Sequence, residues 1–169
     1  MLSEKQVCYW YLLSAFMVEF GAYEWKTMKE TYDASEAVAK FLLKNDLCPR
    51  IQTEDGPFKF LALYAKNREE WIVADLGAMM TGITVVTLYD TLGKESIDYI
   101  LNQTQIKTVV SSSDKLKTLL DLKREGKLPL MQAIIYFDEA KKEDLDAAVA
   151  NEVKLYRYED VISEGKGMK

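Results

Sequence analysis

The chain has 169 residues, of which 49% are hydrophobic and 29% charged, and its formal net charge is -5. These values favour one soluble globular domain over a disordered chain or a polytopic membrane protein. The negative charge and the lack of a Lys/Arg cluster argue against a nucleic-acid-binding surface. The sequence contains no histidine, which excludes Ser-His and Cys-His catalysis and the usual zinc sites in this chain.

The two cysteines, Cys8 and Cys48, lie in dissimilar surroundings and do not have metal-ligand spacing. This pattern favours two structural thiols in an intracellular reducing compartment, with a disulfide as the unsupported alternative. The compartment itself is not fixed by the sequence.

The first segment is an apolar run, Val7–Val18, interrupted only by Ser14 and preceded by a Ser3/Gln6 pair at capping-box spacing. The run predicts a helix that is too short to span a bilayer, which needs about 20 apolar residues. The residues before it carry Lys5 against Glu4, and no clean small-residue cleavage site follows, so the segment is not a convincing signal peptide.

Three interpretations of this helix stay open: packing on its own domain, docking onto another protein subunit, and membrane contact, which is not favoured. The residues that would contact a protein partner are Val7, Trp10, Tyr11, Phe16 and Met17.

The next unit begins with a predicted short strand, Tyr23–Lys26, and continues as a helix opened by a Thr27/Glu30 capping box. This helix is expected to run to about Asn45. Its predicted buried face is Ala34, Val38, Phe41 and Leu42. A breaker at Cys48–Pro49, a polar turn at Gln52–Pro57 and a strand at Phe58–Ala65 follow.

The stretch Lys66–Thr104 contains a complete helix, strand and helix. Asn67 and Glu70 have the spacing of a capping pair, and Gly82 stops the first helix. The predicted apolar stripe of that helix is Ile72, Leu76, Met79 and Met80. The β-branched run Ile83–Leu88 predicts a strand covered on both faces.

The rest of the chain continues to alternate between strands and helices. Strands are predicted at Thr108–Ser111, Ala133–Phe137 and Val153–Tyr156. Helices are predicted from about Asp114 to the Gly126/Pro129 breakers, at Lys142–Asn151 and at Tyr158–Ser163. The expected buried residues are Leu116, Leu119 and Leu120, then Leu145, Ala148 and Val149. Residues Gly165–Gly167 are expected to be a frayed tail.

This alternation predicts an α/β fold, a parallel sheet with helices on both faces. Ligands of such sheets bind beyond the carboxyl ends of the strands, here the loops after Ala65, Leu88, Ser111 and Phe137.

Asp90 in one loop is interpreted as a turn or capping residue rather than a substrate-binding carboxylate. Ser113 is interpreted as a helix N-cap rather than part of a phosphate loop. Asp138 and Glu139 are interpreted as a solvated helix start rather than a metal or acid-base pair.

Several of these segments closely resemble the N-terminal region of eukaryotic long-chain fatty-acid–CoA ligases, which are adenylate-forming (AMP-binding) enzymes. The segments are Ala65–Trp71, Gly82–Val86, Leu88–Gly93 and Leu101–Thr104, with weaker likeness at Tyr23–Thr27 and Tyr158–Val161. The resemblance divides the chain into an apolar N-terminal helix at 1–20, which is not family-like, and an AMP-binding-enzyme-like α/β domain at 21–169.

The family converts a fatty acid, ATP and CoA to acyl-CoA with the help of magnesium. Its phosphate loop ending in Pro-Lys-Gly, its Tyr-Gly-x-Thr-Glu segment, its ribose-binding Asp and its catalytic Lys have no match in this sequence. The resemblance therefore assigns no catalytic, cofactor-binding or metal-binding residue, and no cofactor is expected for this chain alone. The leading hypothesis is a truncated, non-catalytic accessory subunit of a larger assembly. The alternative is part of an active long-chain fatty-acid–CoA ligase completed by another polypeptide.

Overall fold

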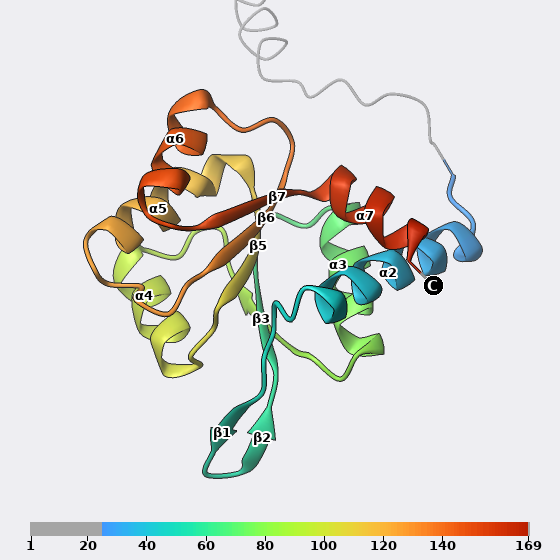
Figure 1. Ribbon diagram of the computed structural model, residues 1–169, viewed down its shortest axis with the longest axis horizontal. Coiled ribbons are helices and arrows are strands. Elements are labelled where there is room, and N and C mark those ends of the chain that lie inside the picture. The colour runs from blue at the N-terminus through green and yellow to red at the C-terminus, as the bar shows by residue number, and fades with distance from the viewer. Residues whose placement is uncertain (1–24, 169) are drawn as a thin grey trace, which may run out of the picture.

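The computed structural model describes residues 25–168, in which a five-stranded parallel sheet forms the centre of the molecule (Figure 1). The strand order is β4-β3-β5-β6-β7. The strands are β3 (Phe60–Tyr64), β4 (Thr84–Leu88), β5 (Thr108–Ser112), β6 (Ala133–Phe137) and β7 (Lys154–Arg157). A separate antiparallel hairpin, β1 (Ile51–Thr53) and β2 (Gly56–Phe58), projects from the domain just before β3.

Helices cover both faces of the sheet, which confirms the predicted fold class (Figure 1). On one face lie α2 (Met28–Lys44), α3 (Glu69–Met80) and α7 (Tyr158–Gly167). On the other lie α4 (Lys94–Gln103), α5 (Leu116–Arg124), which a short 3₁₀ turn at Ser113–Lys115 precedes, and α6 (Lys142–Ala150). Alternate residues of each strand point into one of two apolar cores. In β3, for example, Leu61 and Leu63 pack under α2, α3 and α7, whereas Ala62 and Tyr64 face the opposite core.

The strand order makes this a doubly wound sheet. The chain leaves β3 toward β4 and then crosses back to place β5 on the other side of β3. The helix after β3 lies on one face and the helix after β4 lies on the other (Figure 1). The carboxyl ends of β3 and β5 therefore flank a topological switch point, where open α/β sheets bind ligands.

The capping box predicted for the first helix is present. The Thr27 hydroxyl oxygen accepts a hydrogen bond from the Glu30 backbone N–H (3.2 Å), and a Glu30 carboxylate oxygen accepts one from the Thr27 backbone N–H (2.7 Å). These bonds satisfy N–H groups that have no partner within the helix. The predicted residues Val38, Phe41 and Leu42 are buried, and Ala34 is partly buried against the same core.

We expect Thr27→Ala to lower the free energy of unfolding by about 1 kcal/mol, because it removes the side-chain acceptor of this box. Urea unfolding followed by circular dichroism measures the change. Thr27→Ser keeps the hydroxyl and should retain most of the stability. Equal losses in both variants would contradict a capping role for the oxygen.

Two glycines allow α2 to pack closely against its neighbours. A Cβ on Gly77 of α3 would lie 2.8 Å from the Ser35 carbonyl oxygen and 2.9 Å from Val38 Cβ. A Cβ on Gly165 of α7 would overlap the carbonyl oxygen of Ala37. Gly165 thus lies in an ordered helix and is buried, so the prediction of a frayed tail was wrong.

The start and the buried face of α3 also differ from the prediction. Arg68 occupies the N-cap position instead of Asn67, and the structure shows no side-chain capping bond there. The residues that pack inward are Val73, Ala74, Gly77 and Ala78, whereas Ile72, Met79 and Met80 are largely exposed and Leu76 is half-buried. Close packing against α2 selects the small residues of α3 for the buried side and leaves its larger apolar residues outside.

The strand β4 is an edge strand of the described sheet, and both of its faces are covered in part, as predicted, because Val85 packs against one core and Val86 against the other. Its buried residue is Leu88, Val85 and Val86 are partly buried, and Thr84 and Thr87 are exposed. The β-branched composition is the same for an edge and a central strand, so the sequence alone did not separate them.

Smaller differences affect other elements. The predicted polar turn at Gln52–Pro57 forms most of the β1–β2 hairpin, and Trp25 and Lys26 are not in a strand. In α6, Ala148 is buried as expected, but Val149 is 80% exposed and Leu145 is 39% exposed. The predicted strand Ala133–Phe137 has the same bounds as β6.

The predicted helix Val7–Val18 lies outside the described residues. Among residues 25–168, each helix is too short or too polar to cross a membrane.

Candidate functional site

The side chain of Lys115 lies at the switch point between β3 and β5. Its ammonium group lies 5.4 Å from the centroid of the Tyr64 ring and donates a hydrogen bond of 3.1 Å to the backbone carbonyl of Asp90. The Lys115 side chain is only 15% exposed, and it also lies 3.3 Å from the Asp114 carboxylate. Burial raises the pKa of the Tyr64 hydroxyl, against the opposing effect of this ammonium group. Lys115 therefore connects the loops that follow β4 and β5.

Ser111 lies at the same end of β5, between Tyr64 of β3 and Tyr136 of β6 in the register of the sheet. Its hydroxyl oxygen is fully buried and has no hydrogen-bond partner among the described residues. An unpaired buried hydroxyl costs free energy.

The second charged group at this edge is a clamp formed by Arg68. Its guanidinium group donates two hydrogen bonds to Glu70, of 2.6 and 2.9 Å, and two to Asp138, of 2.7 and 2.9 Å. It also lies 5.0 Å from the centroid of the Phe137 ring. Asp138 has a positive φ of 66°, which Asp tolerates better than most residues, in the turn after β6. The clamp thus joins the start of α3 to the end of β6.

The clamp changes the protonation equilibria of its members. Hydrogen bonds to Glu70 and then to Asp138 raise the pKa of Arg68, which stays charged. The hydrogen bonds from Arg68 lower the pKa of Glu70 below its ordinary value of 4.5. Burial raises the pKa of the nearby Tyr158 hydroxyl, and the Tyr158 ring packs edge-on against Phe137 at 5.3 Å.

Because the pKa of Glu70 is lower in the folded protein than in the unfolded chain, its carboxylate stabilises the fold above the ordinary value of 4.5. This stabilisation is lost as the pH falls through the folded pKa. We expect the difference in unfolding free energy between the wild type and Glu70→Gln to be clear at about pH 7 and much smaller at about pH 3. Urea unfolding at both pH values measures it. A difference that does not depend on pH would contradict this role.

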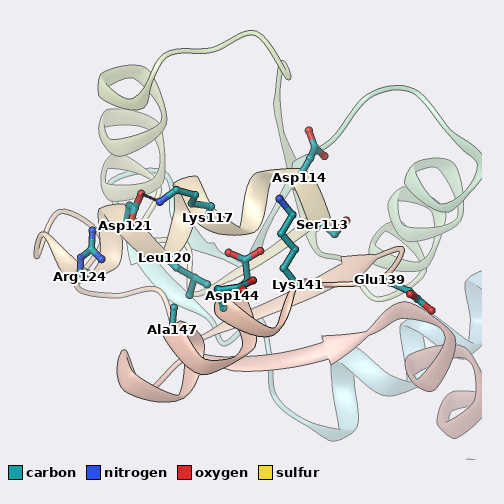
Figure 2. Close-up of a pocket in the computed structure, with 11 residues that line it drawn as sticks. Ser113, Asp114, Lys117, Leu120, Asp121, Arg124, Glu139, Lys141, Asp144 and Ala147 are labelled. Carbon is teal, nitrogen blue, oxygen red and sulfur yellow. Dashed lines mark hydrogen bonds and ion pairs between the residues drawn. The ribbon is translucent and has the colours of Figure 1, made fainter.

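A groove of about 670 Å³ lies between α5 and α6 (Figure 2). Figure 2 shows Lys117 and Asp121 on the α5 side, and Lys141 and Asp144 at the start of α6. Five carboxylates and three cationic side chains line it. Asp121 is already paired with Lys117 (3.1 Å) and Arg124 (2.8 Å). The lining thus mixes charges of both signs, and two of its three cations are already bound to Asp121.

A shallower hollow of about 610 Å³ lies beyond the ends of β3 and β4. Lys66, Asn67, Trp71, Tyr89 and Asp90 are among its lining residues. Lys66 and Asp90 are 4.0 Å apart, at the limit of an ion pair.

The carboxylates and serines considered in the sequence do not form one catalytic group. Asp90 lies in a turn, as expected, and its backbone carbonyl rather than its carboxylate binds Lys115. Ser112, not Ser113, precedes the 3₁₀ turn before α5. Asp138 is not merely a solvated helix start, because it binds Arg68, whereas its neighbour Glu139 lines the groove of Figure 2.

The sequence did not identify Arg68 and Lys115 as the organising residues of this edge. Both contact partners distant in sequence: Arg68 and Asp138 are 70 residues apart, and Lys115 and Asp90 are 25 apart. A single Arg or Lys in a loop carries no local signal of such a pairing.

The donor groups at this edge do not fit a metal ion. Within residues 25–168 no set of three or more Cys, Asp or Glu side chains is placed to hold one. The carboxylates of the clamp are bound to Arg68, and a cationic side chain in this position would repel a metal.

Comparison with known proteins identifies the family to which this chain belongs. The profile of the AMP-binding enzyme family matches residues 7–164. The chain therefore belongs to the AMP-binding enzyme family, as the resemblance of its motifs implied.

Similar proteins include long-chain fatty-acid–CoA ligases. Human long-chain-fatty-acid–CoA ligase 1 is 31% identical over 117 residues, covering 69% of this chain and 16% of the ligase. Fatty acyl-CoA synthetase B of Dictyostelium discoideum is 27% identical over 146 residues, covering 86% of this chain and 20% of the synthetase. The chain thus spans about a fifth or less of the length of these relatives.

Solved structures confirm the fold. The adenylation domain of a carboxylic acid reductase from Segniliparus rugosus, in complex with AMP and a carboxylic acid, superposes with a TM-score of 0.69 at 18% identity. The superposition covers 86% of this chain and 24% of that domain. The described α/β unit is thus the N-terminal part of an adenylate-forming fold.

Proposed function

We propose that this chain is a non-catalytic structural component of the long-chain fatty-acid–CoA ligase type, acting as a subunit of a larger assembly. One observation supports this proposal most directly. Two cations at the carboxyl edge of the sheet are bound by the protein itself: Arg68 holds two carboxylates, and Lys115 lies over a tyrosine ring and binds a backbone carbonyl.

This arrangement matters because adenylate formation requires groups that neutralise phosphate charge in the transition state. A cation contributes to that step only if it is free to approach the phosphates. Arg68 already makes four charge-assisted hydrogen bonds to Glu70 and Asp138, and binding a phosphate would require breaking them. The edge is therefore built to hold the loops of the fold together.

A second candidate function is that of one part of an active long-chain fatty-acid–CoA ligase, completed by another polypeptide that supplies the ATP site. The sequence identity of 31% to a human long-chain-fatty-acid–CoA ligase over most of this chain favours it. Its substrates would then be a long-chain fatty acid, ATP and CoA.

An assay of the purified full chain separates the first proposal from catalysis by this chain alone. The chain is incubated with palmitate, ATP, magnesium and CoA, and acyl-CoA is measured by mass spectrometry. We expect no more product than from a heat-denatured sample. Turnover above that background would overturn the structural proposal.

A complementation assay separates the two candidates. The chain is mixed with a polypeptide carrying the region of human long-chain-fatty-acid–CoA ligase 1 that follows its matched segment. The controls are each polypeptide incubated without the other. Acyl-CoA formed by the mixture but by neither polypeptide alone would establish the second candidate. No product from the mixture would support the first.

A further inference from the structure

The outer side of α3 is an uncovered apolar stripe. Ile72 is 54% exposed, Met79 63% and Met80 44%, and Leu76 between them is half-buried. Their spacing of four, three and one residues places them on one side of the helix. The opposite side, with Val73 and Gly77, is buried against α2 and the core. A stripe of large apolar side chains along a whole helix is a typical contact surface.

The edge strand β4 directly follows this helix in the chain. Val85 packs into the core beneath α2, α3 and α7 but stays partly exposed, and the outer edge of β4 has no neighbouring strand among residues 25–168. The exposed stripe and the open edge are thus joined through the short turn that connects α3 to β4.

The described part of the chain begins at Trp25, and the next residue lies beside the start of α3. Lys26, immediately before α2, forms an ion pair with Glu69, the first residue of α3. Whatever precedes residue 25 therefore starts beside the amino end of the apolar stripe.

The preceding 24 residues have the length and composition to cover the stripe. The apolar run Val7–Val18 contains twelve residues, which as a helix would be about 18 Å long. The α3 helix also has 12 residues and the same expected length. The six residues from 19 to 24 reach at most about 20 Å, enough for a reversal of direction at Lys26.

We propose that residues Val7–Val18 fold back as an apolar helix, antiparallel to α3, and cover its exposed side chains Ile72, Met79 and Met80. In this arrangement the end of the run lies near Glu69, and its beginning, with Cys8, lies near Met79. Burial of Ile72 and the two methionines provides the driving force. The arrangement is independent of whether the chain catalyses a reaction.

A disulfide test uses the native Cys8. We substitute Met79→Cys in the full chain and oxidise it under mild conditions. Cys48 does not interfere, because it is 5% exposed and burial raises the pKa of its thiol to about 12. We expect an intramolecular bridge between Cys8 and position 79, detected by faster migration without reductant and by peptide mass spectrometry. The control is Val149→Cys, 80% exposed on the other face of the sheet, which should not bridge.

Each possible occupant of the stripe predicts a different pattern of disulfide bridges. An intramolecular bridge formed at least ten-fold faster at position 79 than at position 149 would support the proposal. Bridges between two molecules would instead assign the stripe to a second copy of the chain and overturn it. Equal bridging at both positions, or none, would also overturn it and would favour docking of Trp10, Phe16 and their neighbours on another subunit. Circular dichroism of each variant confirms that the fold is intact.

Discussion

Gly165→Ala should destabilise the protein by about 3 kcal/mol or more, although alanine is the better helix former. A Cβ at this position would overlap the carbonyl oxygen of Ala37 and lie 2.6 Å from its carbonyl carbon. Both atoms belong to the backbone of α2, so they cannot move without shifting the whole helix. The helix-propensity gain of about 1 kcal/mol is too small to offset this overlap.

Urea unfolding measures the effect, and the matched control is Gly167→Ala two residues further along α7. Nothing lies within 4 Å of a Cβ on Gly167, which is exposed. That variant should be unchanged or up to about 1 kcal/mol more stable. If both variants had the same stability, the close contact between α2 and α7 would not be a real constraint on the sequence.

Arg68→Met should lower the free energy of unfolding by about 2 kcal/mol. This value is in the lower part of the range for hydrogen bonds to charged groups, because water still reaches Glu70 and Asp138. Methionine keeps an apolar stem over the Phe137 ring but leaves the carboxylates of Glu70 and Asp138 without their shared cation. Their side chains are 27% and 48% exposed, so water replaces part of the lost interaction.

The control for this variant is Arg157→Met. Arg157 pairs with Glu159 two residues later, as Arg68 pairs with Glu70, but both members are about half-exposed and they join no distant segments. Its loss should cost less than about 1 kcal/mol. A similar cost for both substitutions would show that the link to Asp138 adds nothing to stability.

These residues also show what the sequence predicts and what it does not. Several signals contained in a few neighbouring residues were confirmed. The Thr27/Glu30 capping box is present, β6 has the predicted bounds, and Gly82 and Gly126 adopt the positive φ expected of helix breakers.

Features that depend on distant partners were missed. Glu70 has the spacing of a capping residue, but Arg68 binds its carboxylate, and Arg68 is positioned by Asp138 on another strand. The buried side of α3 is set by its crossing with α2 at Gly77, so the larger residues Ile72 and Met79 are outside. Hydrophobicity alone identified the amphipathic helix but assigned the wrong side to the core.

The contact between α2 and α7 has a consequence for synthesis of the protein. The two helices meet at Ala37 and Gly165, so the face of the sheet that they cover joins the beginning of the described chain to its end. The other face is built from α4, α5 and α6, which are separated in the chain only by the strands β5 and β6 and their loops. On a ribosome that second face can therefore assemble progressively, whereas Phe41 and Leu42 remain accessible to chaperones until Gly165 has left the exit tunnel.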